Sequence, residues 1–466
     1  MVQHEGVEWF ENGIHGLQPR WKKDPDSKTI ESLARKHLGG NPQIQFLAQG
    51  GFNKLYRANS DKGPFVMRVA LPVDPHYKTL SEVATMKFVR EEAQIPVPNI
   101  FAFDASSDND LDYEWILIEL VPGQPLRKTW RKLPWDTKEK IVKQLARYHA
   151  SLFRRRFDGI GNIYSSFMRV VAPIGGLRTQ SESREQNRSP SVSTSRFPLS
   201  RAFYSLYSSG VDIVKRLRRR LAVFGGHLLR VLRGIGARLN LSTHSPALPA
   251  TADMTNESNS VQESQNDPPK FTLGRIVSLG FFWGDRLSQD VSRGPFQNSY
   301  EWLSSRLSLM LADQQQILDT SKDEDDIEDA ETSSQAIKKI LKLLPTAFPP
   351  DEHESSFLFH DDLSMQNMMV DEAGKITAVI DWECVSALPL WRACQLPYLL
   401  EGKRRDEEPN RDEYGPDSDE EFPDGAEEDG PDKEGKTIIY WEHLLDYELT
   451  KLRKVYLEEM AKLEPQ

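Results

Sequence analysis

The polar residues most suited to chemistry lie close together late in the chain, in a stretch that reads H-x-D-L-x-x-x-N and ends on a further aspartate. They are His360, Asp362, Asn367 and Asp381. Between Asn367 and Asp381 lie two short apolar runs joined by a turn that contains Gly374. Polar side chains at turns between short strands often face a shared cleft. This spacing therefore predicts a site at which the side chains meet.

The residue types favour phosphoryl transfer. A carboxylate beside an acceptor hydroxyl orients that hydroxyl and accepts its proton, and Asp362 suits this role. Mg²⁺ prefers hard oxygen ligands, which Asn367 and Asp381 supply. A single aspartate in a turn is usually a cap, but the joint spacing favours the functional interpretation. His360 is expected to bond backbone groups around the loop rather than to transfer protons.

The half of the chain that precedes this site alternates between β-rich runs and one helix. Glycine-bearing turns divide residues 44–69 into three runs, and two more runs lie at 99–104 and 114–120. Such runs predict an antiparallel sheet. Apolar residues at helical spacing predict a helix over 80–92. We expect these elements to form one β-rich lobe.

After Pro122 the apolar spacing becomes helical. An acidic run, 322–331, is expected to separate two of the helices, and a strand–turn–strand segment is expected over 357–381. The expected helices cover residues 138–153, 300–318, 334–344 and 439–463. The overall expectation is an α+β chain with two lobes and a cleft between them.

These motifs resemble the aminoglycoside phosphotransferase and choline kinase-like family, and the chain is most similar to its fungal phosphotransferase-family members. The resemblance covers about 44–164 and 271–463. It implies a bilobal, protein-kinase-like fold: an N-lobe with an antiparallel sheet plus a helix, and a mainly helical C-lobe with a small sheet. It also implies that ATP and Mg²⁺ are the cofactors, that Asp362 is catalytic, and that Asn367 and Asp381 bind metal. The family's usual H-G-D is H-D-D here, which adds the side chain of Asp361.

Gly50 and Gly51 form a glycine pair between the first two expected strands. Glycines there let backbone amides approach phosphates closely, although a Gly-Gly pair is also an ordinary hairpin turn. The family resemblance places the adenine of a nucleotide against the backbone from Glu119 to Val121.

Arg68 stands where protein kinases carry a strand lysine, and Glu82 on the following helix is its candidate partner. Arginine can bind phosphate with two parallel hydrogen bonds. An arginine in a surface ion pair is the alternative. Because Arg68 and Asp361 depart from the usual pattern, a catalytically weak pseudokinase or nucleotide-binding scaffold stays open beside the enzyme.

The segment after Asp381 favours a small hydroxylated acceptor. Protein kinases continue into a long activation segment that ends in A-P-E, whereas this chain runs directly into 385–394 without that motif. A protein kinase is therefore the less favoured alternative. An aromatic stripe is more often core than pocket; the candidate pocket walls are Phe281, Phe282, Trp283, Arg293, Tyr300, Trp302 and Trp391.

The expected division of the chain has three parts. They are a helical lead-in at 1–43, a nucleotide-binding N-lobe at 44–121 and a catalytic C-lobe at 122–463. The C-lobe is interrupted by a low-complexity basic insertion at 165–270 and by an acidic disordered loop at 402–437. The net charge of −11 is therefore an average over segments of opposite sign.

Composition bears on partners and location. Residues 201–240 hold nine basic residues and one acidic residue, which suits contact with an anionic membrane surface or with the acidic loop. No base-reading motif accompanies them, so no nucleic-acid partner is expected, and no obligate oligomer is evident. Only two cysteines, no long apolar run and an acidic N-terminus favour the cytoplasm. The resemblance adds mitochondrial association as an alternative.

Overall fold

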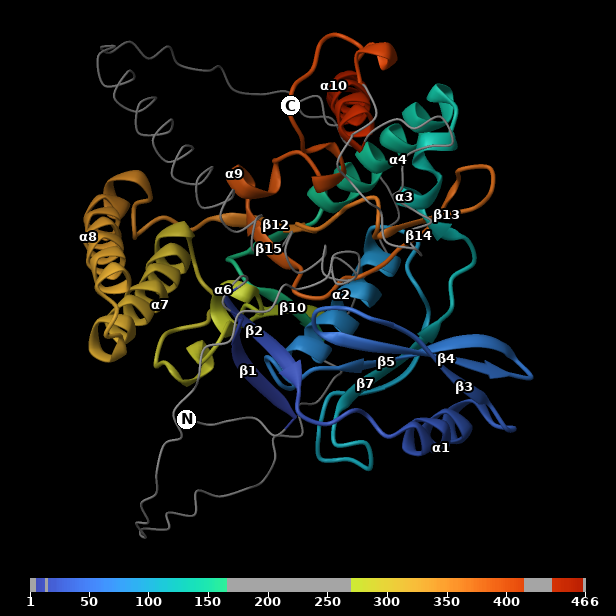
Figure 1. Ribbon diagram of the computed structural model, residues 1–466, viewed down its shortest axis with the longest axis horizontal. Coiled ribbons are helices and arrows are strands. Elements are labelled where there is room, and N and C mark those ends of the chain that lie inside the picture. Colours follow the sequence, from blue (N-terminus) through green and yellow to red (C-terminus); the bar gives the residue numbers. More distant parts are fainter. Residues whose placement is uncertain (1–5, 13–15, 166–269, 415–437, 464–466) are drawn as a thin grey trace, which may run out of the picture.

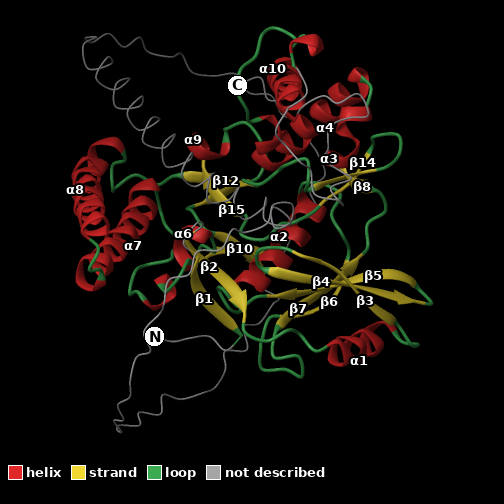
Figure 2. Ribbon diagram, viewed as in Figure 1, coloured by secondary structure: helices red, strands yellow, loops and turns green. Residues whose placement is uncertain are grey.

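The computed structural model describes residues 6–12, 16–165, 270–414 and 438–463. The basic insertion expected at 165–270 lies almost wholly outside the described residues, and its 201–240 segment does so completely. The described part has the α+β, two-lobed architecture expected from the sequence. Figure 2 shows the largest sheet in one lobe and most of the helices in the other, together with several short strands.

The N-lobe is built on a five-stranded antiparallel sheet (Figure 1). Helix α2 (Tyr77–Glu92) covers one face of the sheet, and α1 (Ser27–Leu38) packs its buried side against the other. All five strands were expected from the β-rich runs. In order across the sheet they are β3 (Gln43–Gln49), β4 (Asn53–Ser60), β5 (Gly63–Ala70), β7 (Glu114–Glu119) and β6 (Ile100–Asp104).

The helical lead-in expected at 1–43 is wrong for its first half. Strand β1 (Val7–Asn12) pairs with β2 (Gly16–Trp21) as an antiparallel hairpin. Val7 is buried, and the ring of Trp9 lies 5.0 Å from that of Trp283 in the other lobe. Val7 and Trp9 have the spacing of two that is typical of a strand with one buried face, although charged residues surround them.

The C-lobe packs long helices around short strands (Figure 1). Helix α4 (Trp135–Phe153) lies against α10 (Ile438–Leu463), and α7 (Ser299–Thr320) lies against α8 (Glu324–Ala347). The other α-helices of the described C-lobe residues are single turns. They are α3 (Leu126–Thr129), α6 (Leu279–Phe282) and α9 (Leu390–Ala393).

Three small sheets complete the C-lobe. They are β15–β12–β9, β14–β13–β8 and the pair β10–β11. Their strands are β8 (Gln124–Pro125), β9 (Arg156–Asp158), β10 (Asn162–Ser165), β11 (Phe271–Gly274), β12 (Ser355–Phe359), β13 (Met368–Val370), β14 (Ile376–Val379) and β15 (Ser386–Pro389). Because β8 pairs with β13, the chain that leaves the N-lobe joins the sheet next to the candidate site.

The acidic run at 322–331 does not separate two helices as expected. It forms the start of α8, where the side chain of Asp323 accepts hydrogen bonds from the backbone N–H groups of Asp325 and Asp326. Carboxylates in a first turn are stabilising because the N-terminus of a helix carries partial positive charge. The acidic residues therefore cap and extend the helix.

The loop expected to be disordered over 402–437 is ordered in its described part, residues 402–414. The N–H of Arg405 donates to Thr450 Oγ1 at 2.9 Å, and the N–H of Lys403 donates to Asp446 Oδ1 at 3.1 Å. Side chains of α10 thus bind this backbone, an effect that composition does not reveal. The rest of the loop lies outside the described residues. None of the described helices combines the length and apolar character needed to cross a membrane.

Helix α10 offers a direct test of the C-lobe core. Leu452 is fully buried and Leu457 is 56% exposed on the same helix. We expect Leu452→Ala to lower the free energy of unfolding by about 3 kcal/mol, because a buried leucine leaves a cavity. Leu457→Ala is expected to change it by less than about 0.5 kcal/mol. Urea unfolding measures both, and equal losses would show that α10 is not packed as described.

Candidate active site

The hairpin formed by β13 and β14 brings the two expected metal ligands to the same end of a small sheet. Met368 pairs with Val379 in this hairpin. Asn367 comes just before the first strand and Asp381 just after the second, and the N–H of Ile380 donates to the carbonyl oxygen of Asn367 at 2.9 Å. Local strand pairing therefore sets the spacing of these two residues.

Asp362 and Asn367 are linked by hydrogen bonds within one loop. The side-chain Nδ2 of Asn367 donates to Asp362 Oδ2 at 3.1 Å and to the Asp362 carbonyl oxygen at 2.9 Å. Both bonds use the amide nitrogen of a side chain that is 7% exposed. The amide oxygen is then the atom that remains to bind a cation.

Asp381 has a left-handed backbone conformation, and its surroundings disfavour a charged carboxylate. Its φ of 65° lies in the left-handed region, which aspartate tolerates better than most residues. Loss of solvation and the nearby carboxylate of Glu383 raise its pKa, although Arg68 acts in the opposite direction. Burial and like charge thus both disfavour the ionised form of this carboxylate. A divalent cation would supply positive charge that favours that form.

These residues fit Mg²⁺ in type. Asp381 offers a carboxylate and Asn367 an amide oxygen, and both are hard donors. Within the described part of the chain, no three His, Cys, Asp or Glu side chains are grouped to hold a metal by themselves. Mg²⁺ commonly binds through one or two protein ligands together with waters and substrate phosphates.

Arg68 is the centre of a buried ionic cluster. Its expected ion pair with Glu82 is present, with Nη1 2.5 Å from Glu82 Oε1. Its Nη2 lies 3.0 Å from Asp381 Oδ1 and 2.9 Å from Glu383 Oε2. The side chain of Arg68 is only 9% exposed, so the alternative of a surface ion pair is excluded.

Two members of this cluster, Lys78 and Glu383, were missed from the sequence. Lys78 Nζ lies 2.6 Å from Glu383 Oε2, and Lys78 is 1% exposed. The expected helix began at residue 80, which left Lys78 outside it. A start at Tyr77 would have placed Lys78 four residues before Glu82, on the same helix face. Burial opposes the charge of Glu383, but Lys78 and Arg68 outweigh it and lower its pKa.

The glycine turn lies beside open space. A Cβ at Gly50 or Gly51 would meet no atom within 4 Å, so crowding inside the protein does not require glycine there. The N–H of Gly50 donates to the Asn53 carbonyl oxygen at 2.9 Å and is used within the turn. The next residue, Phe52, is buried, with its ring 5.6 Å from that of Phe282. The turn is thus anchored to the C-lobe.

The connector between the lobes begins at the end of β7. The N–H of Glu119 donates to the Asn99 carbonyl oxygen at 2.9 Å, and the Glu119 carboxylate accepts from Asn99 Nδ2 at 2.7 Å. A nucleotide base therefore cannot use the Glu119 N–H without breaking this bond. Val121, two residues further on, is half-buried.

His360 is 1% exposed, and its Nε2 lies 3.5 Å from the Ile380 carbonyl oxygen. Burial lowers its pKa, so the ring is held neutral beside Trp382. This placement agrees with a role in shaping the loop. Asp361 causes no backbone strain, because the left-handed residues of this loop region within the described chain are Asp381 and Cys384.

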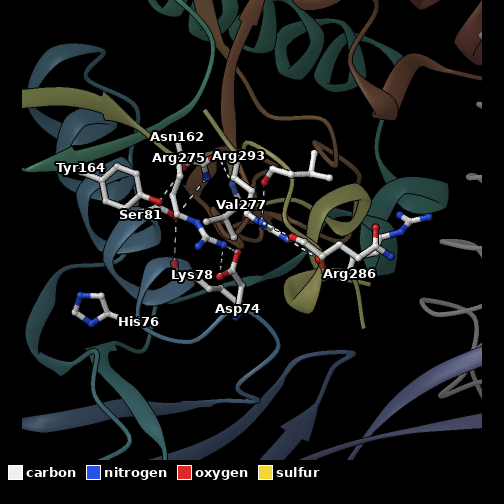
Figure 3. Close-up of polar contacts among 12 residues, drawn as sticks. Asp74, His76, Lys78, Ser81, Asn162, Tyr164, Arg275, Val277, Arg286 and Arg293 are labelled. Atoms are coloured by element: carbon white, nitrogen blue, oxygen red, sulfur yellow. Dashed lines mark hydrogen bonds and ion pairs between the residues drawn. The ribbon is translucent and has the colours of Figure 1, made fainter. Parts of the chain in front are cut away.

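Most of the candidate pocket walls belong to the core or to other contacts. Phe281, Phe282 and Trp302 are buried, and Trp391 Nε1 donates to Ser299 Oγ at 2.8 Å. The guanidinium of Arg293 donates to backbone carbonyl oxygens of the preceding turn, as Figure 3 shows beside Arg286. The interpretation of this aromatic stripe as a pocket is wrong for its buried members.

The contribution of the ionic cluster to the free energy of unfolding can be tested. We expect Arg68→Met to lower the free energy of unfolding by about 3–5 kcal/mol near neutral pH, because it leaves buried carboxylates without their cation. Burial already raises the pKa of Glu82, and losing Arg68 would raise it further. A carboxyl with a pKa above its unfolded value binds a proton in the folded state first, so the deficit should shrink as pH falls.

Urea unfolding at about pH 8 and about pH 5.5 measures this change. The matched control is Arg20→Met, since Arg20 forms an ion pair with Glu8 in which both side chains are about half exposed. That variant should show no measurable loss at either pH. A deficit for Arg68→Met that stays constant with pH would contradict the assignment of buried, uncompensated carboxylates.

Comparison with known proteins places the chain in a family. The model of the phosphotransferase enzyme family matches residues 43–166 and 286–391, about half of the chain. A subtelomeric hrmA-associated cluster protein of Aspergillus fumigatus is 39% identical over 126 residues, 26% of this chain and 25% of the relative. Altered inheritance of mitochondria protein 9 of Saccharomyces cerevisiae is 25% identical over 167 residues, 32% of this chain and 27% of the relative. The chain thus spans about a quarter of the length of these relatives.

Two alignments with solved structures have TM-scores below 0.5. A putative aminoglycoside phosphotransferase from Ralstonia eutropha aligns with a TM-score of 0.37 and 10% identity over 94% of this chain and 81% of its own. The GDP complex of aminoglycoside 2′-phosphotransferase-IIIa aligns with a TM-score of 0.35 and 12% identity over 80% and 79%. The family match on both lobes shows that the chain belongs to the phosphotransferase enzyme family.

Proposed function

We propose that the chain is an ATP- and Mg²⁺-dependent phosphotransferase that transfers the γ-phosphate of ATP to a hydroxyl of a small molecule. The observation that carries this proposal is the grouping of Asp362, Asn367 and Asp381 around one hairpin end, next to Arg68. Oxygen ligands for a cation, a carboxylate for the acceptor and a cationic side chain then lie together.

Each residue has a distinct role in the proposed reaction. Asp362 accepts a hydrogen bond from the acceptor hydroxyl and takes its proton as the oxygen bonds to phosphorus. Asn367 holds Asp362 in place through Nδ2 and offers its amide oxygen to Mg²⁺, and Asp381 offers its carboxylate. When bound, Mg²⁺ neutralises negative charge on the phosphates.

The N-lobe supplies the nucleotide contacts. We propose that the turn at Gly50 and Gly51 lies over the phosphates and that Arg68, positioned by Glu82, faces them. The backbone from Glu119 to Val121 would meet the adenine. Because the Glu119 N–H is engaged with Asn99, the N–H of Val121 is the donor that we propose for the base.

The short path after Asp381 supports a small acceptor. Only residues 382–385 separate Asp381 from β15, which pairs directly with β12. Four residues leave no length for a peptide-binding platform of the protein-kinase type. Transfer of labelled phosphate to peptides, without transfer to small alcohols, sugars or amines, would overturn this part of the proposal.

A nucleotide-binding scaffold is the second candidate, and one observation favours it. Both terminal nitrogens of Arg68 are engaged by carboxylates, so phosphate binding requires the arginine to exchange partners. ATP consumption by the purified protein against a panel of small hydroxylated compounds separates the two. Nucleotide binding without consumption across the panel would favour the scaffold.

We propose a cytoplasmic location, and the name of the yeast relative, a mitochondrial protein, suggests a mitochondrial location as the alternative. Fractionation of cells that express the full-length protein decides between them. Recovery with mitochondria rather than in the cytosolic fraction would overturn the cytoplasmic proposal. The membrane or intramolecular contact proposed for 201–240 concerns residues outside the described part of the chain.

Asp381→Ala tests the metal site. We expect this variant to lose both turnover and the rise in melting temperature that Mg²⁺ and ATP cause together, because a metal ligand is gone. Thermal unfolding with and without Mg²⁺·ATP and a phosphate-transfer assay measure the two effects. Retained turnover would refute the assignment.

Two further variants sharpen this test. Asp362→Asn should keep the nucleotide-dependent stabilisation but lose most turnover, because it removes the proton acceptor and leaves Asp381 in place. Asp136→Ala, at an exposed position in the first turn of α4, should leave both properties unchanged. Loss of stabilisation in Asp362→Asn would assign that residue to metal binding instead.

A further inference from the structure

One carboxylate oxygen of Glu383 contacts side-chain nitrogen atoms from three elements of the N-lobe. Its Oε2 lies 2.6 Å from Lys78 Nζ on α2 and 2.9 Å from Arg68 Nη2 on β5. The same oxygen accepts a hydrogen bond from Asn53 Nδ2, at the start of β4, at 2.9 Å. Glu383 itself belongs to the C-lobe, two residues after Asp381. One carboxylate oxygen therefore links the lobes beside the candidate metal ligand.

Lys78 is held in place by its own helix turn as well as by Glu383. Ser81 Oγ donates to the Lys78 carbonyl oxygen at 3.2 Å, and Asn162 Nδ2 donates to Ser81 Oγ at 3.3 Å. Asn162 Oδ1 in turn accepts from the N–H of Val277 at 2.9 Å. Figure 3 shows this chain of contacts running from α2 to the C-lobe. These bonds fix the backbone of Lys78, and its buried side chain also donates from Nζ to Asn53 Oδ1 at 3.4 Å.

The charges in this cluster are unequal. Two cations, Arg68 and Lys78, face three carboxylates, Glu82, Asp381 and Glu383. An isolated polyphosphate would have to compete with Glu383 for the cations and would meet a net negative site. A polyphosphate that carries a divalent cation brings positive charge for Asp381 and is less repelled.

Building on the proposed function, we propose that Glu383 is a positioning residue that holds Arg68 and Lys78 and thereby makes nucleotide binding depend on a divalent cation. Glu383 engages both cations through one oxygen, so Asp381, which shares only Arg68 with it, is the carboxylate that would hold the metal. Metal-free nucleotide binds more weakly because it cannot replace Glu383 without adding uncompensated negative charge.

The test compares the dissociation constant of ATP with excess EDTA with that of ATP with excess Mg²⁺, by calorimetry on the full chain. In the wild type we expect metal-free ATP to bind at least about tenfold more weakly. Glu383→Gln keeps the size and an acceptor oxygen but removes the charge. It should tighten metal-free binding and reduce the ratio of the two constants about tenfold or more.

Lys78→Met should change the ratio in the opposite direction, because it removes a cation. The matched control is Glu459→Gln. Glu459 is a similarly buried carboxylate that forms an ion pair with Arg147, and its variant should leave the ratio unchanged. Circular dichroism checks the fold of each variant. A purely structural role for Glu383 would weaken both forms of ATP equally, and an unchanged ratio overturns the inference.

The outcomes separate the two proposals. If the wild type binds Mg²⁺·ATP but Glu383→Gln and Lys78→Met leave the ratio unchanged, the inference fails and the proposed function stands. If the wild type binds no ATP in either form, the proposed function fails and the inference fails with it. Should both variants fail to fold, metal-free ATP that binds the wild type as tightly as Mg²⁺·ATP still overturns the inference.

Discussion

The buried ionic cluster at the boundary between the lobes is the constraint on which the rest of the structure depends. Arg68 and Lys78 are both almost fully removed from solvent, and a buried charge is tolerated only where opposite charge and hydrogen bonds compensate it. The compensating carboxylates come from α2 and from the segment after β14. The N-lobe and the C-lobe must therefore meet correctly for either to bury its charges.

The residues of the candidate site are positioned by contacts within a short stretch of the chain. The β13–β14 hairpin sets Asn367 and Asp381 at one end of a sheet, and a turn of four intervening residues brings Asp362 to the Asn367 amide. Strand β8 joins the same sheet directly after the connector. The loop that holds Asp362 and Asn367 can thus be positioned locally, whereas its position relative to Arg68 depends on the ionic cluster.

Apolar contacts support the same meeting of the lobes. Phe52, next to the glycine turn, packs on Phe282, and Trp9 of the first hairpin packs on Trp283. The basic insertion leaves and re-enters the fold at one point, because β10 and β11 pair with Ser165 opposite Phe271. An insertion whose two ends are adjacent can be long without disturbing the core.

The sequence alone determined the elements and most of the candidate site, because both are encoded locally. Strand alternation, helical periodicity and the spacing of Asp362, Asn367 and Asp381 depend on residues near one another in the chain. The β1–β2 hairpin and the start of α8 are also encoded locally. In the hairpin, charged residues alternate with the apolar ones, and in α8 the acidic residues cap the helix.

Only the tertiary structure decided which charges meet. Lys78 and Glu383 are separated by about 300 residues, and a helical lysine or a glutamate in a turn is commonplace in isolation. Their burial, and the convergence of three donors on one oxygen, follow from how the lobes pack. The same is true of the aromatic residues expected to line a pocket, since a ring in a core and a ring in a cleft have the same sequence signature.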